Sequence, residues 1–267
     1  MIAFFIILSV LIVLVLIYFL FLVRPYNKEP DKVLLCDYAH RGLHNESIPE
    51  NSLFAFEAAA SKGFGMELDI QLSKDGEVMV FHDYNLKRMT GLDKKLNELT
   101  VTELKELSLK GTDEKIPTLK EVLELVGGRV PILVEIKGED FNYEVCEKAA
   151  EILKDYKGPY CLESFNPFLI GKMSKLLPHS FRGLLYTNYL RGPNVNFIKA
   201  LGAAMALNFI AKPNFISYNK LDRNSLPVNI TTKLYRTYKF VWTVVGGKEI
   251  STAKGKGEFP IFEKPED

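Results

Sequence analysis

Residues 2–23 form an apolar segment without a charged side chain, and this feature constrains the chain more than any other. As a helix, the segment is roughly 33 Å long at about 1.5 Å per residue, enough to cross the hydrocarbon core of a bilayer. A buried core helix of a soluble fold is disfavoured because the segment has no polar face. A cleaved signal peptide is disfavoured because there is neither a basic start nor a small-residue cleavage pattern before Arg24. We therefore expect residues 1–23 to be a transmembrane anchor.

The residues after this segment predict its orientation. Arg24, Lys28 and Lys32 follow it, whereas only the start methionine precedes it. Since cytoplasmic flanks carry an excess of Lys and Arg, we expect a single-pass protein of the cell membrane with its globular part in the cytoplasm. Residues 24–32 are polar and predict a linker. Residues 33–267, about 235 in number, then form a domain of a size that suits one α/β barrel or two small units.

Composition narrows the function classes of this domain. With 34 basic and 33 acidic residues, the chain has a net charge of +1, which excludes the overall electrostatic footprint of a nucleic-acid-binding protein. The three cysteines include no CxxC pair, which argues against both a disulfide framework and a zinc site. We expect Cys36, Cys146 and Cys161 each to be a small buried apolar residue.

Two segments alternate strictly between apolar and polar residues and carry acids on the polar face. In GMELDIQL, Glu67 and Asp69 project from the same face of a strand. In PILVEIKG, Glu135 and Lys137 share one face in the same way. A solvated edge strand also alternates, but Lys and Thr are expected on its polar face rather than two acids and an amide. The pattern therefore favours strands whose acidic face has a chemical role.

Strands and helices also alternate along the rest of the domain. Ser52 and Thr118 are each placed to cap a helix. Repeated strand and helix with short loops predict a mostly parallel sheet, and seven or eight such units predict an α/β fold, the closed TIM (β/α)8 barrel. Further strands are expected at 33–39, 77–83, 160–164, 181–186 and 239–245, and further helices at 143–158 and 165–178.

In such a barrel, the active site lies at the carboxyl ends of the strands. Glu67, Asp69 and Glu135 would meet there and repel one another without a counter-charge. Because these ligands are all oxygen, the set favours Mg²⁺ or Ca²⁺, with Mn²⁺ as a further option, over Zn²⁺ or copper. The sequence therefore predicts a site for one divalent cation.

Basic residues at the same strand ends complete a reaction site. Arg41 and Lys137 would lie beside the cation, an arrangement that suits a phosphate. His40 follows the first strand and His82 the third, so one histidine could deprotonate the attacking group while the other protonates the leaving alkoxide. Phosphodiester cleavage is the reaction class that uses all of these groups.

The ordered motifs HRG, PEN, ExD, HD, ExK and WTV, between residues 34 and 245, resemble those of the glycerophosphodiester phosphodiesterase family. The resemblance implies a TIM barrel and the hydrolysis of glycerophosphodiesters to glycerol 3-phosphate and an alcohol. By their places in these motifs, His40 and His82 are similar to the family's acid/base pair, Glu67, Asp69 and Glu135 to its metal ligands, Arg41 and Lys137 to its phosphate contacts, Glu50 and Asn51 to its supporting residues, and Trp242 to the aromatic residue that lines its pocket.

The chain departs from the family pattern in two places. Its ending, KGKGEFPIFEKPE, differs from the family's usual one, so the last strand stays open and we interpret the segment as a polar tail. The connection from Tyr84 to Lys115 is short, as in the compact bacterial members. Outside the motifs, Glu163 is expected to be a buried or rim carboxylate, and His44 and His179 have no expected catalytic role.

Three functions remain open from the sequence. The favoured one is a membrane-anchored, divalent-cation-dependent glycerophosphodiester phosphodiesterase. The second is a lysophospholipase D-like activity on acylated lipids, which the anchor and the apolar residues around the site suggest. The third is a catalytically silent membrane scaffold on the same barrel, which the complete set of site residues disfavours. The expected partners are thus a glycerophosphodiester or lysophospholipid substrate and the membrane, without nucleic acid.

Overall fold

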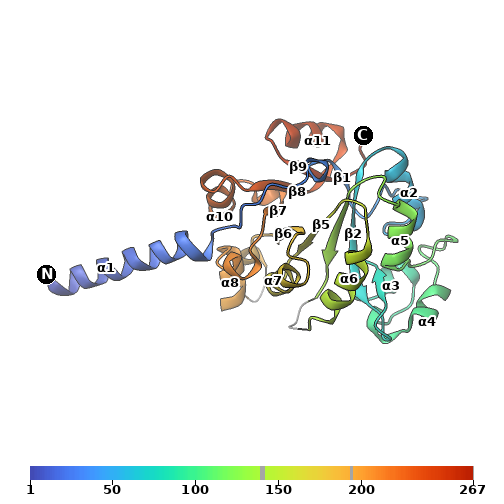
Figure 1. Cartoon of the computed structure of the whole chain (residues 1–267), viewed down its shortest axis with the longest axis horizontal. Helices are drawn as coiled ribbons and strands as arrows, with labels where there is room; N and C mark the ends of the chain where they lie inside the picture. Colours follow the sequence, from blue (N-terminus) through green and yellow to red (C-terminus); the bar gives the residue numbers. More distant parts are fainter. Residues whose placement is uncertain (139–141, 193–194, 267) are drawn as a thin grey trace.

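The computed structural model describes residues 1–138, 142–192 and 195–266. At the amino terminus, helix α1 (Ile2–Ile17) continues into the π-helical segment η1 (Tyr18–Leu22), and Figure 1 shows this helix projecting from the rest of the molecule. No residue of α1 is buried. Together, α1 and η1 form a helix that is long and apolar enough to cross a membrane, by length and composition.

Eight parallel strands form the wall of the barrel. They are β1 (Tyr38–Ala39), β2 (Gly65–Leu72), β4 (Ile132–Ile136), β5 (Tyr160–Ser164), β6 (Phe181–Tyr186), β7 (Phe215–Asn219), β8 (Tyr238–Val245) and β9 (Phe259–Glu263). Their order is β1-β9-β8-β7-β6-β5-β4-β2, and a pairing between β1 and β2 closes the ring. The predicted TIM (β/α)8 barrel is confirmed.

Helices surround this ring in Figure 1. The two predicted caps are present, at the starts of α2 (Leu53–Ser61) and α5 (Leu119–Val126). The Ser52 hydroxyl accepts the backbone N–H of Ala55 at the start of α2, and Thr118 forms a reciprocal capping box with Glu121 at the start of α5. Both arrangements satisfy amides that the helix itself leaves unpaired. The helices around the barrel are α2 (Leu53–Ser61), α5 (Leu119–Val126), α6 (Glu144–Asp155), α7 (Pro167–Leu176), α8 (Phe197–Ala203), α9 (Asn208–Ala211), α10 (Leu226–Asn229) and α11 (Gly246–Gly255).

Strand β2 separates apolar from acidic side chains as the alternation predicts. Met66, Leu68 and Ile70 belong to the hydrophobic core that also contains residues of the surrounding helices. Glu67 and Asp69, on the other face, meet Glu135 of the neighbouring strand β4 inside the barrel. The two-residue period of one strand therefore serves both the core and the barrel interior.

A cluster rich in aromatic rings closes the amino-terminal end of the barrel. The Phe215 ring lies so close to Gly183 that a Cβ there would come within 2.0 Å of the ring, so the site requires glycine. The prediction of a strand at 33–39 is wrong except at Tyr38–Ala39, because Lys32–Leu34 forms a 3₁₀ helix that covers this end of the barrel instead. This base cluster consists of Leu34, Tyr38, Leu133, Cys161, Phe181, Phe215, Phe240 and Ile261.

The three cysteines are free thiols. Cys146 lies in the core between the sheet and the helices, and Cys161 lies in the base cluster. Both are buried, as expected, whereas Cys36 is only partly buried. Burial raises the pKa of the Cys146 thiol to about 12, which agrees with a structural role.

Strand β3 (Val78–Val80) is antiparallel to β2 and lies outside the closed ring. The prediction of a strand at 77–83 is confirmed in its centre, but this strand is not a wall strand of the barrel. A turn at Asp75, where Gly76 takes the left-handed conformation, reverses the chain. As a result, β3 runs back toward the mouth of the barrel and brings His82 there.

The chain between β3 and α5 forms a small helical layer with its own core. It contains α3 (Lys87–Thr90), the 3₁₀ helix η3 (Leu96–Glu98) and α4 (Val101–Glu106). Its buried apolar residues pack on one another rather than in the main core, and they are Met79, Phe81, Leu86, Met89, Leu96, Leu99, Leu104, Leu109 and Ile116. The segment from Tyr84 to Lys115, predicted as a short connection, therefore forms a small layer beside the mouth of the barrel.

The segment interpreted as a polar tail supplies the last strand of the barrel, so that interpretation is wrong. Strand β9 pairs with both β8 and β1 and thereby closes the ring. Phe259 and Ile261 pack in or against the base cluster. Glu263 lies on the same face two residues further on, at the mouth. The alternation in FPIFE was the available signal, although Pro260 interrupts the usual appearance of a strand.

Candidate active site

Three carboxylates meet at the mouth of the barrel. Asp69 on β2 and Glu135 on β4 are direct partners in the strand register, and Glu67 lies two residues before Asp69 on the same face. Ligand oxygens of the three residues all lie within 4.8 Å of one another, and all three residues are buried. We call these residues the acid cluster; the sequence predicted their convergence.

Basic groups surround the acid cluster. The Lys137 ammonium lies 2.9 Å from Asp69 Oδ1 and 2.7 Å from Glu135 Oε1. The Arg41 backbone N–H donates to Glu67 Oε2 at 2.8 Å, and its guanidinium Nε lies 3.6 Å from Asp69 Oδ2. Both predicted phosphate contacts are therefore at the cluster, where their positive charge offsets part of its negative charge.

The loop that follows β1 has an unusual backbone. Arg41 and Asn51 both have positive φ angles, 55° and 53°. Gly42 has φ of 78°, and a Cβ there would meet Ala55 at 2.8 Å, so the glycine of the HRG motif is required sterically. In this conformation, the Asn51 amide donates to Asp69 Oδ2 at 2.9 Å. The PEN asparagine thus orients a member of the acid cluster.

Glu50 lies near the site but bonds to arginines rather than to the acid cluster. Its carboxylate accepts from the Arg41 guanidinium at 2.6 Å and from two nitrogens of Arg88 at 2.7 and 2.8 Å. Arg88 also donates to Asp83 at 2.6 Å. Although burial opposes the effect, these bonds hold the pKa of Glu50 below its ordinary value. Glu50 therefore fixes the position of Arg41.

His40 is oriented by a carboxylate that the sequence did not indicate. Its Nδ1 donates to Glu263 Oε1 at 2.7 Å, and its Nε2 lies 4.0 Å from Glu67 Oε2. Glu263 also lies 3.8 Å from His44 Nε2. Because the Nδ1 proton is held by Glu263, the free Nε2 is the atom that faces the acid cluster.

His82 is oriented in a similar way from the opposite side. Its Nδ1 donates to Asp83 Oδ1 at 2.6 Å. The Gln71 amide donates to the backbone carbonyls of Phe81, His82 and Asp83, which holds the whole turn against β2. The His82 side chain is 32% exposed and that of His40 is 16% exposed, so both are reachable from the mouth.

Burial and neighbouring charges shift the pKa values of the three carboxylates in the acid cluster in different directions. Burial, with the charges of Asp69 and Glu135, raises the pKa of Glu67 well above its ordinary range. Burial also raises the pKa of Glu135 to about 7, against the opposing charge of Lys137. For Asp69, burial is outweighed by the surrounding positive charges, Lys137 first, and its pKa is lowered. Burial lowers the pKa of both His40 and His82.

The chemistry of the acid cluster fits a divalent cation. Among the described residues, Glu67 Oε1 is buried without a hydrogen-bond partner. A buried oxygen of this kind is costly unless it is paired. The cluster offers only carboxylate oxygens, which hard cations such as Mg²⁺ and Ca²⁺ prefer. The residues present therefore fit the predicted cation.

A small pocket of about 100 Å³ lies over the acid cluster. Trp242, predicted as a pocket residue, lines it, donates from Nε1 to the Ser217 carbonyl and packs edge-on against Phe165 at 5.6 Å between ring centroids. Glu163 also lines this pocket and is buried, as expected. Burial, with the charge of Glu135, raises the pKa of Glu163 well above its ordinary range.

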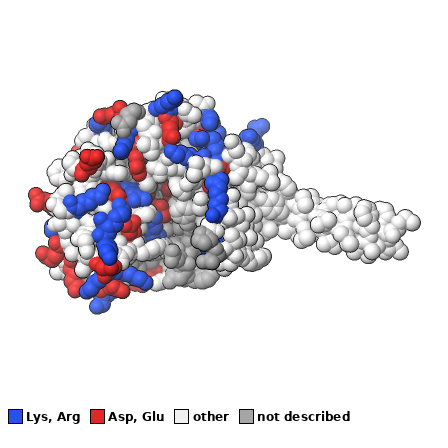
Figure 2. Space-filling view, turned by 180° about the vertical axis from the view of Figure 1, so that it is seen from behind, with Lys and Arg blue, Asp and Glu red and all other residues white. Residues whose placement is uncertain are grey.

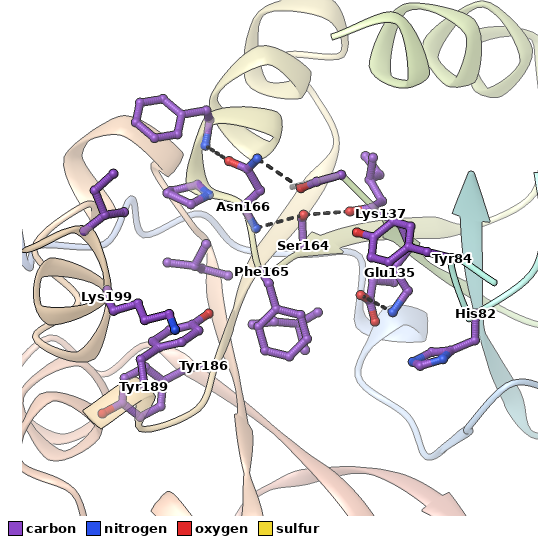
Figure 3. A pocket seen from close by; sticks show the side chains of 18 of the residues that line it. His82, Tyr84, Glu135, Lys137, Ser164, Phe165, Asn166, Tyr186, Tyr189 and Lys199 are labelled. Atoms are coloured by element: carbon purple, nitrogen blue, oxygen red, sulfur yellow. Dashed lines mark hydrogen bonds and ion pairs between the residues drawn. The ribbon is translucent and has the colours of Figure 1, made fainter. Parts of the chain in front are cut away.

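A larger cavity of about 1060 Å³ opens beside the small pocket. In Figure 3, His82, Glu135 and Lys137 lie on one side of this cavity, and Tyr186 and Tyr189 lie on the other. Much of the remaining wall is apolar, including Phe165, Leu184, Leu185, Ile198, Met205 and Leu207. The charged site therefore borders a space that suits an apolar group.

Comparisons with known proteins agree with this arrangement. The sequence model of the glycerophosphoryl diester phosphodiesterase family matches residues 40–244. A glycerophosphodiester phosphodiesterase of Caldanaerobacter subterraneus is 36% identical over 159 residues, which cover 55% of this chain and 65% of that protein. A lysophospholipase D of Rattus norvegicus is 34% identical over 145 residues, 49% of this chain and 45% of that protein. The chain thus spans less than two thirds of the length of these two relatives.

A solved structure resembles most of the chain. It is an Oleispira antarctica phosphodiesterase in complex with the product sn-glycerol-3-phosphate, with a TM-score of 0.73 and 25% sequence identity. The likeness covers 86% of this chain and 93% of that one. The barrel domain and its mouth therefore have a counterpart in which glycerol 3-phosphate is the product.

Proposed function

Since the chain belongs to the glycerophosphoryl diester phosphodiesterase family of enzymes, we propose that it hydrolyses glycerophosphodiesters to glycerol 3-phosphate and an alcohol, with a divalent cation and two histidines. The observation that carries the proposal is the buried acid cluster, which has two basic residues and two oriented histidines around it at one barrel mouth. Phosphodiester cleavage needs charge stabilisation on the phosphate and proton transfer at both the attacking and the leaving oxygen.

Glu67, Asp69 and Glu135 would hold the cation. When bound, a Mg²⁺ or Ca²⁺ ion would neutralise the acid cluster and polarise a non-bridging phosphate oxygen. Arg41 and Lys137, which already contact the cluster, would bind the same phosphate and hold it beside the histidines. Asn51 and Glu50 would keep Asp69 and Arg41 in place.

His40 and His82 would move the protons. Each ring has its Nδ1 bonded to a carboxylate, which leaves Nε2 free to accept a proton and later donate it. A phosphate beside Lys137 would have one histidine near the attacking oxygen and the other near the leaving oxygen. General acid–base catalysis of this kind contributes about 100-fold to 10,000-fold in rate. Trp242 would line the substrate side of the small pocket.

The test uses the full chain, purified in detergent, with glycerophosphocholine and either Mg²⁺ or Ca²⁺. Glycerol 3-phosphate should be released, and chelation of the cation should stop the release. His40→Ala should lose most of this activity with the fold intact. If no diester, including lysophospholipids, were hydrolysed, the proposal would fail in favour of a catalytically silent membrane scaffold.

A second candidate is a lysophospholipase D-like activity on acylated lipids. The large apolar cavity beside Lys137 favours it, because an acyl chain attached to the glycerol would need such a space. The likeness to the lysophospholipase D of Rattus norvegicus gives further support. Turnover of lysophosphatidylcholine measured against that of glycerophosphocholine separates the two substrates.

We further propose that residues 1–23 anchor the protein in the cell membrane, with 24–32 as the linker and 33–267 as the catalytic domain. Arg24, Lys28 and Lys32 support a cytoplasmic domain. In sealed membrane vesicles of known orientation, protease should cleave the domain only where the cytoplasmic side is accessible. Cleavage from the opposite side alone would reverse the assigned orientation.

A further inference from the structure

In Figure 1, α8 and α10 lie on the side of the catalytic domain that meets the end of the membrane helix, and both expose large apolar side chains. Phe197, at the start of α8, is 77% exposed, and Leu226, in α10, is 72% exposed. Monomeric soluble proteins rarely leave such residues grouped on one side without a partner. We call the following residues the anchor-side surface: Leu190, Phe197, Ile198, Phe209, Leu226 and Leu234.

Three residues at or next to elements that carry this surface are bonded to the end of the membrane helix. Tyr18 donates its hydroxyl hydrogen to the carbonyl of Ala204, just after α8, at 2.8 Å. Asn208, the first residue of α9, donates to the carbonyl of Val23 at 2.7 Å. The hydroxyl of Tyr235, next to Leu234, bonds to the carbonyl of Phe19. The helix and the domain are therefore joined at this surface.

The polar residues after the helix also lie on the domain. The backbone N–H of Tyr26 donates to the Pro213 carbonyl at 2.8 Å, and the Asn214 amide donates to the Tyr26 carbonyl at 2.7 Å. Lys28 bonds to the backbone carbonyl of His179. The segment predicted as a linker thus runs along the barrel, and it leaves little freedom for the domain to move away from the membrane.

The length of the membrane helix determines where the anchor-side surface lies relative to the bilayer. Helix α1 has 16 residues. At about 1.5 Å per residue it is roughly 24 Å long, short of the roughly 30 Å of a hydrocarbon core. A complete span needs η1 as well, which brings it to 21 residues. Because η1 is the part bonded to the domain, the bonded elements must lie at the membrane interface.

The charge on this side of the domain suits an anionic lipid surface. Between residues 189 and 236 the sequence has seven Lys and Arg residues and a single acid, Asp222. Asp222 is paired with Arg191 at 2.7 Å, and Lys220 and Arg223 are paired with Glu249 and Glu258 from outside this range. Lys212, Lys233 and Arg236 are exposed. On the face that Figure 2 shows, the surface nearest the helix is largely uncharged, and the charged side chains closest to it are mostly Lys and Arg.

We propose that the anchor-side surface is a second membrane contact, which seats the catalytic domain on the bilayer with Phe197 among the lipid headgroups and the upper acyl chains. The inference rests on the anchor in the proposed function. Apolar side chains beside basic ones are the composition that binds anionic lipid interfaces. The partner is the lipid surface itself, rather than a second protein.

Contact between the anchor-side surface and the membrane would bring the large cavity close to lipid-derived substrates. Helix α8 supplies Ile198, Lys199 and Gly202 to the wall of the large cavity. The same helix, through Phe197, forms part of the anchor-side surface. With α8 at the interface, the cavity lies next to the lipid headgroups, so a lipid-derived diester can approach His82 and Lys137 directly from the membrane.

The test places a fluorophore on the full chain in vesicles made of equal parts phosphatidylcholine and phosphatidylglycerol. Phe197→Cys carries the label, and nitroxide groups on the lipid acyl chains act as quenchers. Phe54→Cys is the matched control, because Phe54 is 64% exposed on α2, which Figure 1 shows on the side of the barrel away from α1. The unsubstituted chain gives the background labelling of the native cysteines. We expect about fivefold more quenching at position 197 than at position 54.

A second variant tests the surface without the label on α8. With the fluorophore on Leu226→Cys, the additional change Phe197→Glu should reduce lipid quenching about threefold, because it places a charge at the interface. Phe54→Glu in the same background should leave quenching unchanged. An unchanged thermal unfolding temperature shows that the variants are folded.

Three other results of the quenching and extraction measurements would each contradict the proposed membrane contact. If the chain resists carbonate extraction and yet position 197 is as exposed to water as position 54, the surface does not contact lipid. If position 197 is shielded from water but is not quenched by the nitroxide lipids, a protein, including a second copy of this chain, covers the surface. If carbonate extracts the chain, the anchor and the seating both fail, whereas hydrolysis of glycerophosphocholine, measured separately, still tests the activity.

Discussion

The two ends of the barrel are built from the same strands and have opposite chemistry. On β4, Leu133 belongs to the base cluster, and Glu135, two residues later, belongs to the acid cluster. On β9, Ile261 lies in the base cluster and Glu263 binds His40. A step of two residues along each strand therefore leads from a packed apolar core to a charged site. The base can supply stability while the mouth keeps charges that oppose one another.

A comparable step occurs on two further strands. Tyr38 in the base cluster is followed two residues later by His40, and Cys161 by Glu163. Because side chains two residues apart share a face, each of these strands contributes one residue to the base and one to the mouth. Changes at the mouth should therefore alter the reaction and leave the fold intact, and changes at the base should do the reverse.

The largest expected effect is at the mouth. His82→Ala should reduce kcat about 100-fold to 10,000-fold, because a proton-transfer group is lost. The thermal unfolding temperature should stay the same. His179→Ala is the control, since His179 is exposed and outside the site, and it should keep full activity. Equal rates for the two variants would remove His82 from the mechanism.

A change at the base should have its main effect on stability. Phe240 lies 4.3 Å from Phe215 and 5.4 Å from Phe259, measured between ring centroids. Phe240→Ala should lower the free energy of unfolding by about 3 to 5 kcal/mol, because it leaves a cavity in a packed core. At a temperature where the variant is folded, its kcat should be close to that of the unsubstituted chain.

The control for this change is Phe54→Ala. Phe54 is mostly exposed, so its loss should alter the free energy of unfolding by less than about 0.5 kcal/mol. Denaturant titration of both variants gives the comparison. A loss of activity in folded Phe240→Ala would show that the base and the mouth are coupled, contrary to the division described above.

Glu263→Gln should have an intermediate effect at the mouth. The amide keeps the shape of the side chain but not the charge that orients His40 and supports its proton. A loss of about 10-fold to 100-fold in kcat is expected for an orienting group of this kind. The limb of the pH–rate profile that reports His40 should shift to lower pH. Glu266→Gln, at an exposed glutamate, should change neither quantity.

The smallest expected effect concerns pH and the cation. The pKa of Glu135 is about 7 in the folded chain without a cation, and its ordinary value is 4.5. The folded state therefore holds a proton that the unfolded state releases, and the stability of the cation-free chain should fall as the pH rises from about 4.5 through 7. The melting temperature in chelator measures this fall.

Two comparisons isolate the part of this pH dependence that comes from Glu135. Glu135→Gln should flatten it in chelator, because the amide does not titrate. Added Mg²⁺ or Ca²⁺ should raise the melting temperature most at high pH, since the cation replaces the proton. A cation effect equally large in Glu135→Gln would remove this residue from the proposed ligand set.

The sequence by itself determined the features that depend on neighbours along the chain. The alternation in β2 and β4 predicted that Glu67, Asp69 and Glu135 face the same way, and the caps at Ser52 and Thr118 predicted two helix starts. Periodicity and capping depend on residues only a few positions apart, so they can be recognised from the sequence alone. The apolar helix and the (β/α)8 architecture follow from the same local signals.

The tertiary structure decided what depends on contacts between distant residues. His40 meets Glu263 across 223 positions of sequence, and Arg88 reaches Glu50 across 38. No local pattern encodes these pairs, because they exist only once β9 closes the ring beside β1 and the helical layer folds beside the mouth. The reversed direction of β3 and the bond between the end of the apolar N-terminal helix and α9 likewise arise from packing, which sums contributions from the whole chain.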